Sequence, residues 1–389
     1  LIGFCGMWRR HEDKILTPKK TFAVIVAAHN ERAVIGQLID NLQKLEYPKP
    51  YYDIFVVADN CTDDTAEIAR AAGAIVCERR SDVGKGKGFA LEWMFARLFS
   101  MERQYDAVVV FDADNLVHPR FLLEMNNRLL KGDQLIQGYL DAKNPYDTWV
   151  SGTFAIAFWV IDHIWHLAKT NIGLSSVLGG TGMCITTEVL KRHGWGATCL
   201  TEDMEFTMKS LVEGIKTTWA HDAIVYDEKP LTFMQSWNQR KRWAQGQFDV
   251  AHRFIPKMLK AGFERRDIRI LDGCLHLLQP HFLLLSTFFV IVSYVQSAFP
   301  PFYTNIYALM PSQLMTVIML GQYILPIIIL LKIHVKWKAW LYLILYPVFI
   351  YSWIPIVFLG FLHRNEHEWS HTQHTRALSY GELVGKEKV

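Results

Sequence analysis

One stretch of the chain limits its fold more than any other, because Gly273–Leu331 contains no Asp, Glu, Lys or Arg. A soluble domain keeps charged side chains on its surface, so an uncharged stretch of this length indicates burial in a membrane. A helix needs roughly 20 apolar residues to cross a bilayer. The stretch therefore predicts two spans, at about 276–298 and 313–331, joined by a proline-rich turn.

A second uncharged stretch, Ala339–Leu362, is also long enough to cross a bilayer, but we expect it to be an interfacial helix. Pro347 and Pro355 would break or kink a straight helix here. The stretch is also rich in Tyr and Trp, which are enriched at the headgroup level. Two crossings would return the chain to the cytosol beside the basic flank at Lys332. We therefore expect a multi-pass protein of the cell membrane whose polar domain lies in the cytosol.

Residues 20–140 follow a different pattern, in which short β-rich runs alternate with helix-like stretches. The β-rich runs are Phe22–Ala28, Ile54–Ala58, Ala74–Cys77, Ala107–Phe111 and Gln134–Tyr139, and the helix-like stretches are 33–45, 64–72, 87–100 and 119–131. Such alternation is typical of an α/β domain with a mostly parallel sheet covered by helices. Ligands of such sheets bind beyond the carboxyl ends of the strands.

The charge and the cysteines exclude some classes of function. The formal net charge is +3, which gives no indication of a nucleic-acid partner. The six cysteines are scattered without metal-ligand spacing, as expected of reduced thiols in a cytosolic domain. Two Trp-containing segments, 148–169 and 235–254, either lie at the membrane interface or pack on the sheet as ordinary helices.

Asp112 and Asp114 close the apolar run Val108–Phe111. Two carboxylates one residue apart at a strand end can converge on one cation, and Mg²⁺ and Mn²⁺ prefer oxygen ligands and often bridge to phosphate. Most Asp-x-Asp sequences are solvated loops, but the apolar strand before this one favours a site for Mg²⁺ or Mn²⁺.

Asp59 and Lys87 are further candidates for contacts to a ligand. Asp59 directly follows the run Ile54–Ala58. At this position a ligand contact is favoured over capping of the next helix. Lys87 belongs to the segment Gly84–Gly88, whose glycines permit close approach of the backbone and whose lysines can neutralise phosphate. A flexible solvated loop is the alternative for this segment.

Two later motifs each allow two interpretations. Thr201-Glu202-Asp203 precedes an amphipathic helix that Thr201 could cap. Its carboxylates are either simply stabilised by the helix dipole or include a general base. The segment Gln239–Trp243 is either a basic interfacial helix or a site where Arg242 neutralises a diphosphate and Trp243 stacks on a sugar.

A set of motifs resembles, in its order along the chain, that of the processive, membrane-integrated synthases of glycosyltransferase family 2, which make cellulose, hyaluronan, chitin and poly-N-acetylglucosamine. The motifs are Ala27–Glu31, Asp59, Asp112-x-Asp114, Thr201-Glu202-Asp203 and Gln239-x-x-Arg242-Trp243. The resemblance covers roughly residues 20–250 and the membrane region after them. It implies a GT-A fold and an inverting, processive transfer from a UDP-sugar to a growing polysaccharide, with UDP-glucose favoured over UDP-N-acetylglucosamine. The alternative is a non-processive membrane enzyme with a lipid acceptor.

The resemblance also implies a role for each motif. Contacts to the donor are expected from Asn30, Glu31, Asp59, Lys87, Asp112, Gln239 and Arg242, and a metal site from Asp112 and Asp114. Catalysis is expected from Thr201, Glu202 and Asp203, with Asp203 as general base, and acceptor contacts from Gly180, Thr181, Gly182 and Trp243. A gating loop over the donor is expected at Trp369, His371, Thr372, His374 and Arg376.

These expectations divide the chain into five parts. They are the end of an N-terminal membrane helix and a linker (1–19), the GT-A catalytic domain (20–234), interfacial amphipathic helices (235–272), the membrane region (273–362) and a cytosolic tail (363–389).

Overall fold

The computed structural model describes residues 2–9, 14, 17–197, 199–298, 312–366 and 376–387. Four residues of the expected gating loop, Trp369, His371, Thr372 and His374, lie outside these ranges, and so does most of the turn expected between the two predicted spans. Arg376, the fifth residue of the expected loop, lies within them.

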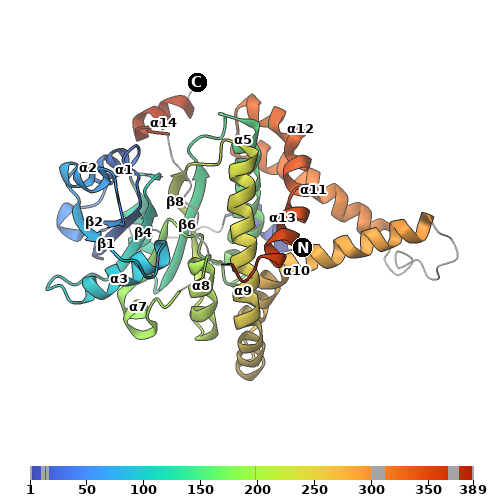
Figure 1. The fold of residues 1–389 in the computed structure, drawn as a ribbon, viewed down its shortest axis with the longest axis horizontal. Coiled ribbons are helices and arrows are strands. Elements are labelled where there is room, and N and C mark those ends of the chain that lie inside the picture. The colour runs from blue at the N-terminus through green and yellow to red at the C-terminus, as the bar shows by residue number, and fades with distance from the viewer. Residues whose placement is uncertain are drawn as a thin grey trace.

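Eight strands of the described chain form one sheet (Figure 1). They are β1 (Phe22–Ala28), β2 (Tyr52–Asp59), β3 (Ile75–Arg79), β4 (Ala107–Asp112), β5 (Leu116–Val117), β6 (Leu135–Ala142), β7 (Met183–Thr186) and β8 (Thr217–Asp227). Their order across the sheet is β3-β2-β1-β4-β7-β6-β8-β5. The five predicted runs correspond to β1, β2, β3, β4 and β6, whereas β5, β7 and β8 were not predicted.

The sheet is mixed, which corrects the expectation of a mostly parallel one. The pairs β1–β2, β1–β4, β2–β3 and β6–β8 are parallel, whereas β7 is antiparallel to both β4 and β6, and β5 is antiparallel to β8. The direction of β7 follows from where the chain enters it. Gly182 donates its backbone N–H to the carbonyl of Val110 near the carboxyl end of β4, so the next residues can only run back along β4.

Helices cover both faces of the sheet. In the first 265 residues they are α1 (Ile35–Leu42), α2 (Thr65–Ala71), α3 (Lys87–Phe99), α4 (Phe121–Leu130), α5 (Trp149–Ile161), α6 (Ala168–Asn171), α7 (Thr187–His193), α8 (Glu202–Val212) and α9 (Phe233–Arg265). The central strand β1 shows why they are needed. Val24 packs in the cluster that includes residues of α1 and α4, and Ile25 packs in the one that includes residues of α3 and α8. Both are fully buried, as expected for a central parallel strand.

The Trp-containing segment predicted at 148–169 packs inside the protein as α5, one π-helical turn η3 (Asp162–Leu167) and α6. Thr148 begins α5 with a capping box, because its Oγ1 accepts from the backbone N–H of Ser151 at 3.1 Å. Trp159 is 5% exposed and belongs to a core that also contains residues of β6 and of the C-terminal helices. Of the two interpretations left open, the structure supports the packed helix.

The long helix α9 joins the sheet domain to the C-terminal helices α10 (Ile268–Ala298), α11 (Ser312–Ile333), α12 (Trp337–Tyr351) and α13 (Trp353–Leu362). Arg240 of α9 is fully buried and donates to the carbonyl of Phe349 at 3.1 Å and to Ser352 Oγ at 2.8 Å. Its guanidinium carbon also lies 4.3 Å from the ring centroid of Phe349. This cation anchors α9 to the junction of α12 and α13.

Within the described residues, two segments are long and apolar enough to cross a bilayer, Ile268–Val292 and Trp337–Leu362. The most apolar window of the first is 11% buried in the protein and that of the second 33%, so the first exposes more of its apolar surface. The second contains the stretch expected to be interfacial, and it changes helix at Ser352. The expected span at 313–331 falls in α11, of which Tyr323–Ile333 is a shorter apolar helix. Which segments cross stays a prediction.

The tail returns to the sheet domain. The last helix, α14 (Tyr380–Glu387), lies on the side of the sheet domain, away from the projecting helices α10 and α11 (Figure 1). Leu378 and Leu383 pack against Leu116 of β5 and Tyr226 of β8. Because these contacts are direct, α14 and the sheet domain lie on the same side of any membrane.

Candidate active site

The carboxyl ends of β1, β2 and β4 bring three of the predicted motifs together. β1 lies between β2 and β4, and Ala27 of β1 is opposite Asp112 of β4. Residues that follow neighbouring parallel strands meet at one edge of the sheet. His29–Glu31, Asp59 and the Asp112–Asp114 motif are therefore neighbours in space.

A cavity of about 1870 Å³ opens along this edge. Most of the predicted site residues line it: Glu31, Asp59, Lys87, Asp112, Asp114, Gly180, Thr181, Thr201, Glu202, Asp203, Gln239, Arg242 and Trp243. Asn30 and Gly182 are not part of its lining. The same cavity is also lined by apolar residues of α10, α12 and α13, among them Pro280, Leu283, Phe349, Trp353 and Val357.

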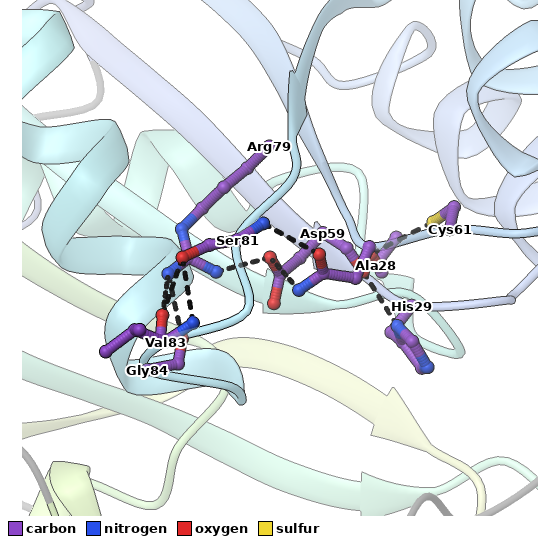
Figure 2. Close-up of polar contacts among 9 residues, drawn as sticks. Ala28, His29, Asp59, Cys61, Arg79, Ser81, Val83 and Gly84 are labelled. Carbon is purple, nitrogen blue, oxygen red and sulfur yellow. Dashed lines mark hydrogen bonds and ion pairs between the residues drawn. The ribbon is translucent and has the colours of Figure 1, made fainter.

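Asp59, which was expected to contact the donor, is paired within the protein (Figure 2). Its Oδ1 accepts from Arg79 Nη1 at 2.5 Å, and both side chains are 8% exposed. Arg79 Nη2 also donates to the carbonyl of Gly84 at 2.8 Å, so Arg79 ties the end of β2 to the Gly-rich segment. Sequence reasoning missed Arg79, because a partner on a neighbouring strand leaves no local signal.

The turn after β1 is held from the side of β2. Asn30 has a φ of +56°, a left-handed conformation that Asn tolerates, and its Oδ1 accepts from the backbone N–H of Thr62 at 2.8 Å. His29 Nδ1 donates to the carbonyl of Asp59 at 2.7 Å. Asn30 therefore shapes the turn, whereas Glu31, which is 6% exposed, reaches the cavity.

Lys87 begins α3 and lies among carboxylates. Its ammonium group pairs with Asp112 and donates to the carbonyl of Gly180 at 2.6 Å. Burial opposes its charge, but Asp112, Glu202 and Asp203 outweigh burial and raise the pKa of Lys87. Lys87 thus joins the end of β4 to the loop before β7, and a diphosphate would compete with Asp112 for the same ammonium group.

Asp112 and Asp114 differ in what they offer to a cation. The side chain of Asp112 is 40% exposed, whereas Asp114 is 5% exposed and its two oxygens accept from Asn115 Nδ2 at 3.2 Å and Glu228 N at 2.9 Å. No three His, Cys, Asp or Glu side chains of the described residues could hold a metal ion together. Mg²⁺ is often bound by one or two carboxylates plus substrate phosphates, and this pair fits such a site.

Thr201, Glu202 and Asp203 stand at the start of α8, where the Thr201 side chain makes no capping hydrogen bond. Burial and the neighbouring Asp203 raise the pKa of Glu202 to about 7, and burial also raises the pKa of Asp203. Asp203 Oδ1 accepts from the backbone N–H of Met204 at 2.8 Å. Asp203 Oδ2 lies toward Gly180, where an added Cβ would be 3.3 Å away. A carboxylate with a raised pKa and one oxygen directed into a cavity can act as a general base.

Gln137 of β6 supports the loop beside Asp203. Its Oε1 accepts from the backbone N–H of Gly179 at 2.8 Å, and its Nε2 donates to the carbonyl of Thr181 at 2.9 Å. Gly180, between them, has a φ of +81°, which favours glycine. Sequence reasoning missed Gln137, because its position inside an apolar strand gave no sign of a polar contact.

Asn115 links the same loop to the carboxylate motif. Its Oδ1 accepts from the backbone N–H of Asp112 at 3.0 Å and also hydrogen-bonds with Thr181 Oγ1. Asn115 is 1% exposed. Gly182, which was expected at the acceptor, packs instead against Val225, whose Cγ2 would lie 2.8 Å from an added Cβ.

Gln239, Arg242 and Trp243 line the cavity from α9. Burial lowers the pKa of Arg242, while Glu202 and Asp112 oppose that shift, so the guanidinium acts on the same carboxylates as Lys87. The ring of Trp243 packs against Phe154 and Phe158 of α5, with ring centroids 5.9 Å and 6.3 Å apart.

The comparisons with known proteins agree with this arrangement. The profile described as glycosyltransferase-like family 2 matches residues 18–246, more than half of the chain.

The chain belongs to glycosyltransferase family 2.

Several curated relatives are similar to the family 2 part of the chain. A probable glycosyltransferase, YdaM of Bacillus subtilis, is 27% identical over 65% of this chain and 60% of its own length. A β-monoglucosyldiacylglycerol synthase of Nostoc is 29% identical over 61% of this chain and 51% of its own length. Bovine hyaluronan synthase 2 is 23% identical over 40% of this chain and 30% of its own length. The chain thus spans about half to three fifths of the length of the first two of these relatives.

Among solved structures, this chain resembles a mannosyltransferase of Pyrobaculum calidifontis, whose structure was determined with GDP-Man and Mn²⁺. The TM-score is 0.62, with 16% identity and coverage of 93% of this chain and 92% of that one. At this identity the likeness shows the fold, a GT-A domain with a mixed sheet followed by helices.

Within the described residues, Arg376 of the tail contacts a residue next to the carboxylate motif of the cavity. The backbone N–H of Arg376 donates to Glu228 Oε2 at 3.1 Å, and its guanidinium pairs with Asp147 at 3.0 Å. Glu228 is the residue whose own N–H donates to Asp114. One residue of the expected gating loop is therefore connected to the carboxylate motif through Glu228.

Proposed function

We propose that this family 2 protein transfers a hexose from a UDP-sugar to a lipid acceptor at the membrane surface, with inversion at the anomeric carbon. The observation that carries this proposal is the shared cavity. It is lined at once by Asp112 and Asp203 and by apolar residues of α10, α12 and α13, such as Leu283 and Val357. An amphiphilic acceptor can thus place its hydroxyl beside Asp203 and its chain among apolar helices.

The residues of the cavity support the chemistry of such a transfer. Asp203 Oδ2 takes the proton of the acceptor hydroxyl as its oxygen bonds to the anomeric carbon. The bond from that carbon to the diphosphate breaks on the opposite face, and UDP leaves. Arg242 and Lys87 stabilise the charge that develops on the leaving diphosphate. Because one displacement occurs, an α-linked donor yields a β-linked product.

Asp112 and Asp114 are the residues that would hold a divalent cation. When bound, Mg²⁺ or Mn²⁺ supplies Lewis-acid stabilisation of the diphosphate. The exposed carboxylate of Asp112 and the donor phosphates would complete the site, while Asn115 and Glu228 hold Asp114 in place. The Mn²⁺ and GDP-Man of the Pyrobaculum mannosyltransferase support this assignment by analogy of fold.

The relatives and the cavity together support the proposed donor and acceptor. A relative named β-monoglucosyldiacylglycerol synthase supports a glucosyl donor and a lipid acceptor. Processive synthesis of a polysaccharide, with UDP-glucose or UDP-N-acetylglucosamine, is the second candidate. It is favoured by the connection of Arg376 to Glu228 and by the similarity to hyaluronan synthase 2.

The location follows from the apolar surface of the C-terminal helices. Large apolar side chains of α10 are exposed, including Phe282 and Phe288 at 51% and 59%. Exposed apolar patches of this kind mark membrane or protein contacts. We infer that α10 enters the cell membrane and that the sheet domain and α14 face the cytosol, where UDP-sugars are available.

The test is a panel of UDP-sugars offered to the full chain in lipid nanodiscs, with release of UDP and the mass of the product measured. We expect UDP-glucose to be used and one hexose to be added to a lipid. A ladder of polymer lengths would favour the processive candidate instead. No UDP release with any donor and acceptor would refute the proposal.

The metal site has a separate test. We expect EDTA to abolish transfer and Mn²⁺ or Mg²⁺ to restore it, because the leaving diphosphate needs a cation. Asp114→Ala should lower the rate about a hundredfold. Full activity in EDTA would contradict the metal site without affecting the acceptor assignment.

A further inference from the structure

A second group of buried charges lies beside the cavity and plays no part in the transfer described above. It comprises Asp162 in the π-helical turn η3, Asp141 at the end of β6, and Asp227 and Lys229 at the end of β8. Asp162 and Asp227 line the cavity. A π-helical turn inside a helix is uncommon and is frequent at functional sites.

Asp162 has a carboxylate oxygen to which the described protein residues make no hydrogen bond. It is 1% exposed, and its Oδ2 has no hydrogen-bond partner among the residues that the structure describes. Asp227 Oδ1 also lacks a hydrogen-bond partner among the described residues, although Asp227 forms an ion pair. Asp141 Oδ1 accepts from Trp159 Nε1 at 2.7 Å, and Lys229 Nζ lies 2.7 Å from Asp227 Oδ1. A buried polar atom without a partner is costly, so the free oxygen of Asp162 indicates a ligand.

The protonation of the group favours a neutral ligand. Burial raises the pKa of Asp162 well above its usual range, and Asp141 and Asp227 raise it further, although Lys229 lowers it. A carboxyl group that keeps its proton can both donate and accept a hydrogen bond. Asp227, which is paired with Lys229, lines the cavity and offers carboxylate acceptors.

Aromatic rings form the wall of this part of the cavity and connect it to the predicted acceptor end. Lys229 Nζ lies 3.4 Å from the ring centroid of Phe158. Phe158 packs against Phe154 with centroids 5.6 Å apart and lies 6.3 Å from the ring of Trp243. A polar floor with aromatic walls suits a molecule that has hydroxyl groups on an otherwise apolar ring.

We propose that Asp162 and Asp227, backed by Lys229, form a subsite for saccharide hydroxyl groups of the acceptor other than the one that is glycosylated. This inference rests on the proposed function and narrows it, because it requires a sugar headgroup or the sugar end of a glycan. An acceptor with one hydroxyl, such as diacylglycerol, would leave the subsite unused.

The test compares acceptors that differ in this respect. The full chain in phosphatidylcholine nanodiscs receives UDP-glucose with octyl β-glucoside, with cellobiose or with 1-octanol. We expect the sugar-bearing acceptors to be preferred. Octyl β-glucoside against cellobiose distinguishes a glycolipid from a free glycan. A preference for 1-octanol over both sugars would overturn the inference.

Substitutions of Asp162 test whether this residue causes the preference for sugar-bearing acceptors. We expect Asp162→Leu to raise the KM for octyl β-glucoside about tenfold, the loss of one buried hydrogen bond, and to leave the KM for 1-octanol unchanged. Asp162→Asn keeps a donor and an acceptor and should stay close to the wild type. Asp40→Asn, on the exposed face of α1, is the matched control. Equal KM values for octyl β-glucoside in the wild type and Asp162→Leu would refute the subsite.

Binding measured directly separates this inference from the proposed function. Quenching of Trp fluorescence by octyl β-glucoside, with UDP and Mn²⁺ present, needs no turnover. Loss of this binding in Asp162→Leu supports the subsite even if the chain transfers no sugar. Unchanged binding refutes the subsite even if transfer proceeds. Asp162→Ala, which adds no volume, replaces the Leu variant if that variant no longer binds UDP.

Discussion

Two groups of carboxylates in the described part of the chain differ in their supply of positive charge. In the first, Asp112, Glu202 and Asp203 lie close to both Lys87 and Arg242, whose pKa values those carboxylates affect. In the second, Asp141, Asp162 and Asp227 share the influence of Lys229. Both groups line or adjoin one cavity, yet they are suited to different tasks.

The difference shows how positive charge decides what a buried carboxylate can do. A buried carboxylate beside cations can ionise, and it can then accept a proton or bind a metal ion. A buried carboxylate with too few cations keeps its proton and acts as a neutral hydrogen-bonding group. We therefore propose proton transfer and phosphate chemistry for the first group, and contacts to neutral hydroxyl groups for the second.

The largest expected effect is at the base of the first group. Asp203→Asn should lower kcat about a thousandfold, because an amide cannot take the proton of the acceptor. Binding of UDP, measured by calorimetry, should be almost unchanged, since the proposed role of Asp203 is at the acceptor hydroxyl. Glu213→Gln, at the exposed end of α8, is the control. Turnover near that of the wild type would remove Asp203 from its proposed role.

The next effect concerns the cation of the second group. Lys229→Met should lower the free energy of unfolding by about 3 kcal/mol, because Asp227 loses its partner in a buried site. Its thermal midpoint, compared with that of Lys44→Met at an exposed site, measures the loss. A midpoint equal to that of the control would show that the second group does not depend on Lys229.

A smaller effect is expected from pH. Glu202 has a pKa of about 7 and interacts with Asp203, so the pair titrates together. Transfer should rise about tenfold from pH 6 to pH 8 as the pair loses its proton. Glu202→Gln should move this rise to lower pH, because it removes a negative neighbour of Asp203. A pH profile of kcat that is the same in both proteins would contradict this coupling.

The smallest effect tests the neutral state of Asp162. Its pKa is raised in the folded protein, so the unfolded chain loses that proton first, and stability falls as pH rises above about 4. Asp162→Asn removes this dependence and should change the free energy of unfolding by less than about 1 kcal/mol near pH 5. Thermal midpoints at pH 5 and pH 8 should differ less in the variant. An equal difference would mean that Asp162 is ionised in the folded protein.

The positions of Asp112 and of the neighbouring Asp59 could be predicted from the sequence, because the signal for each is local. Asp59 and Asp112 stand at the ends of apolar runs. Neighbouring parallel strands bring their carboxyl ends to one edge of the sheet, and this does not depend on the other elements of the fold. The apolar C-terminal stretches are equally local, since composition alone shows that their surface avoids water.

What only the tertiary structure decided are the pairings between distant residues. Lys87 and Gly180 are 93 positions apart, and Arg79 and Asp59 are 20 apart, and neither pairing leaves a periodic signal. Sequence reasoning missed the second group for the same reason. In the sequence, Asp162 cannot be told apart from a solvent-exposed polar residue at the end of a helix. Periodicity reports which face of an element is buried, whereas the partner of a buried charge depends on which elements pack together, and that is a property of the whole fold.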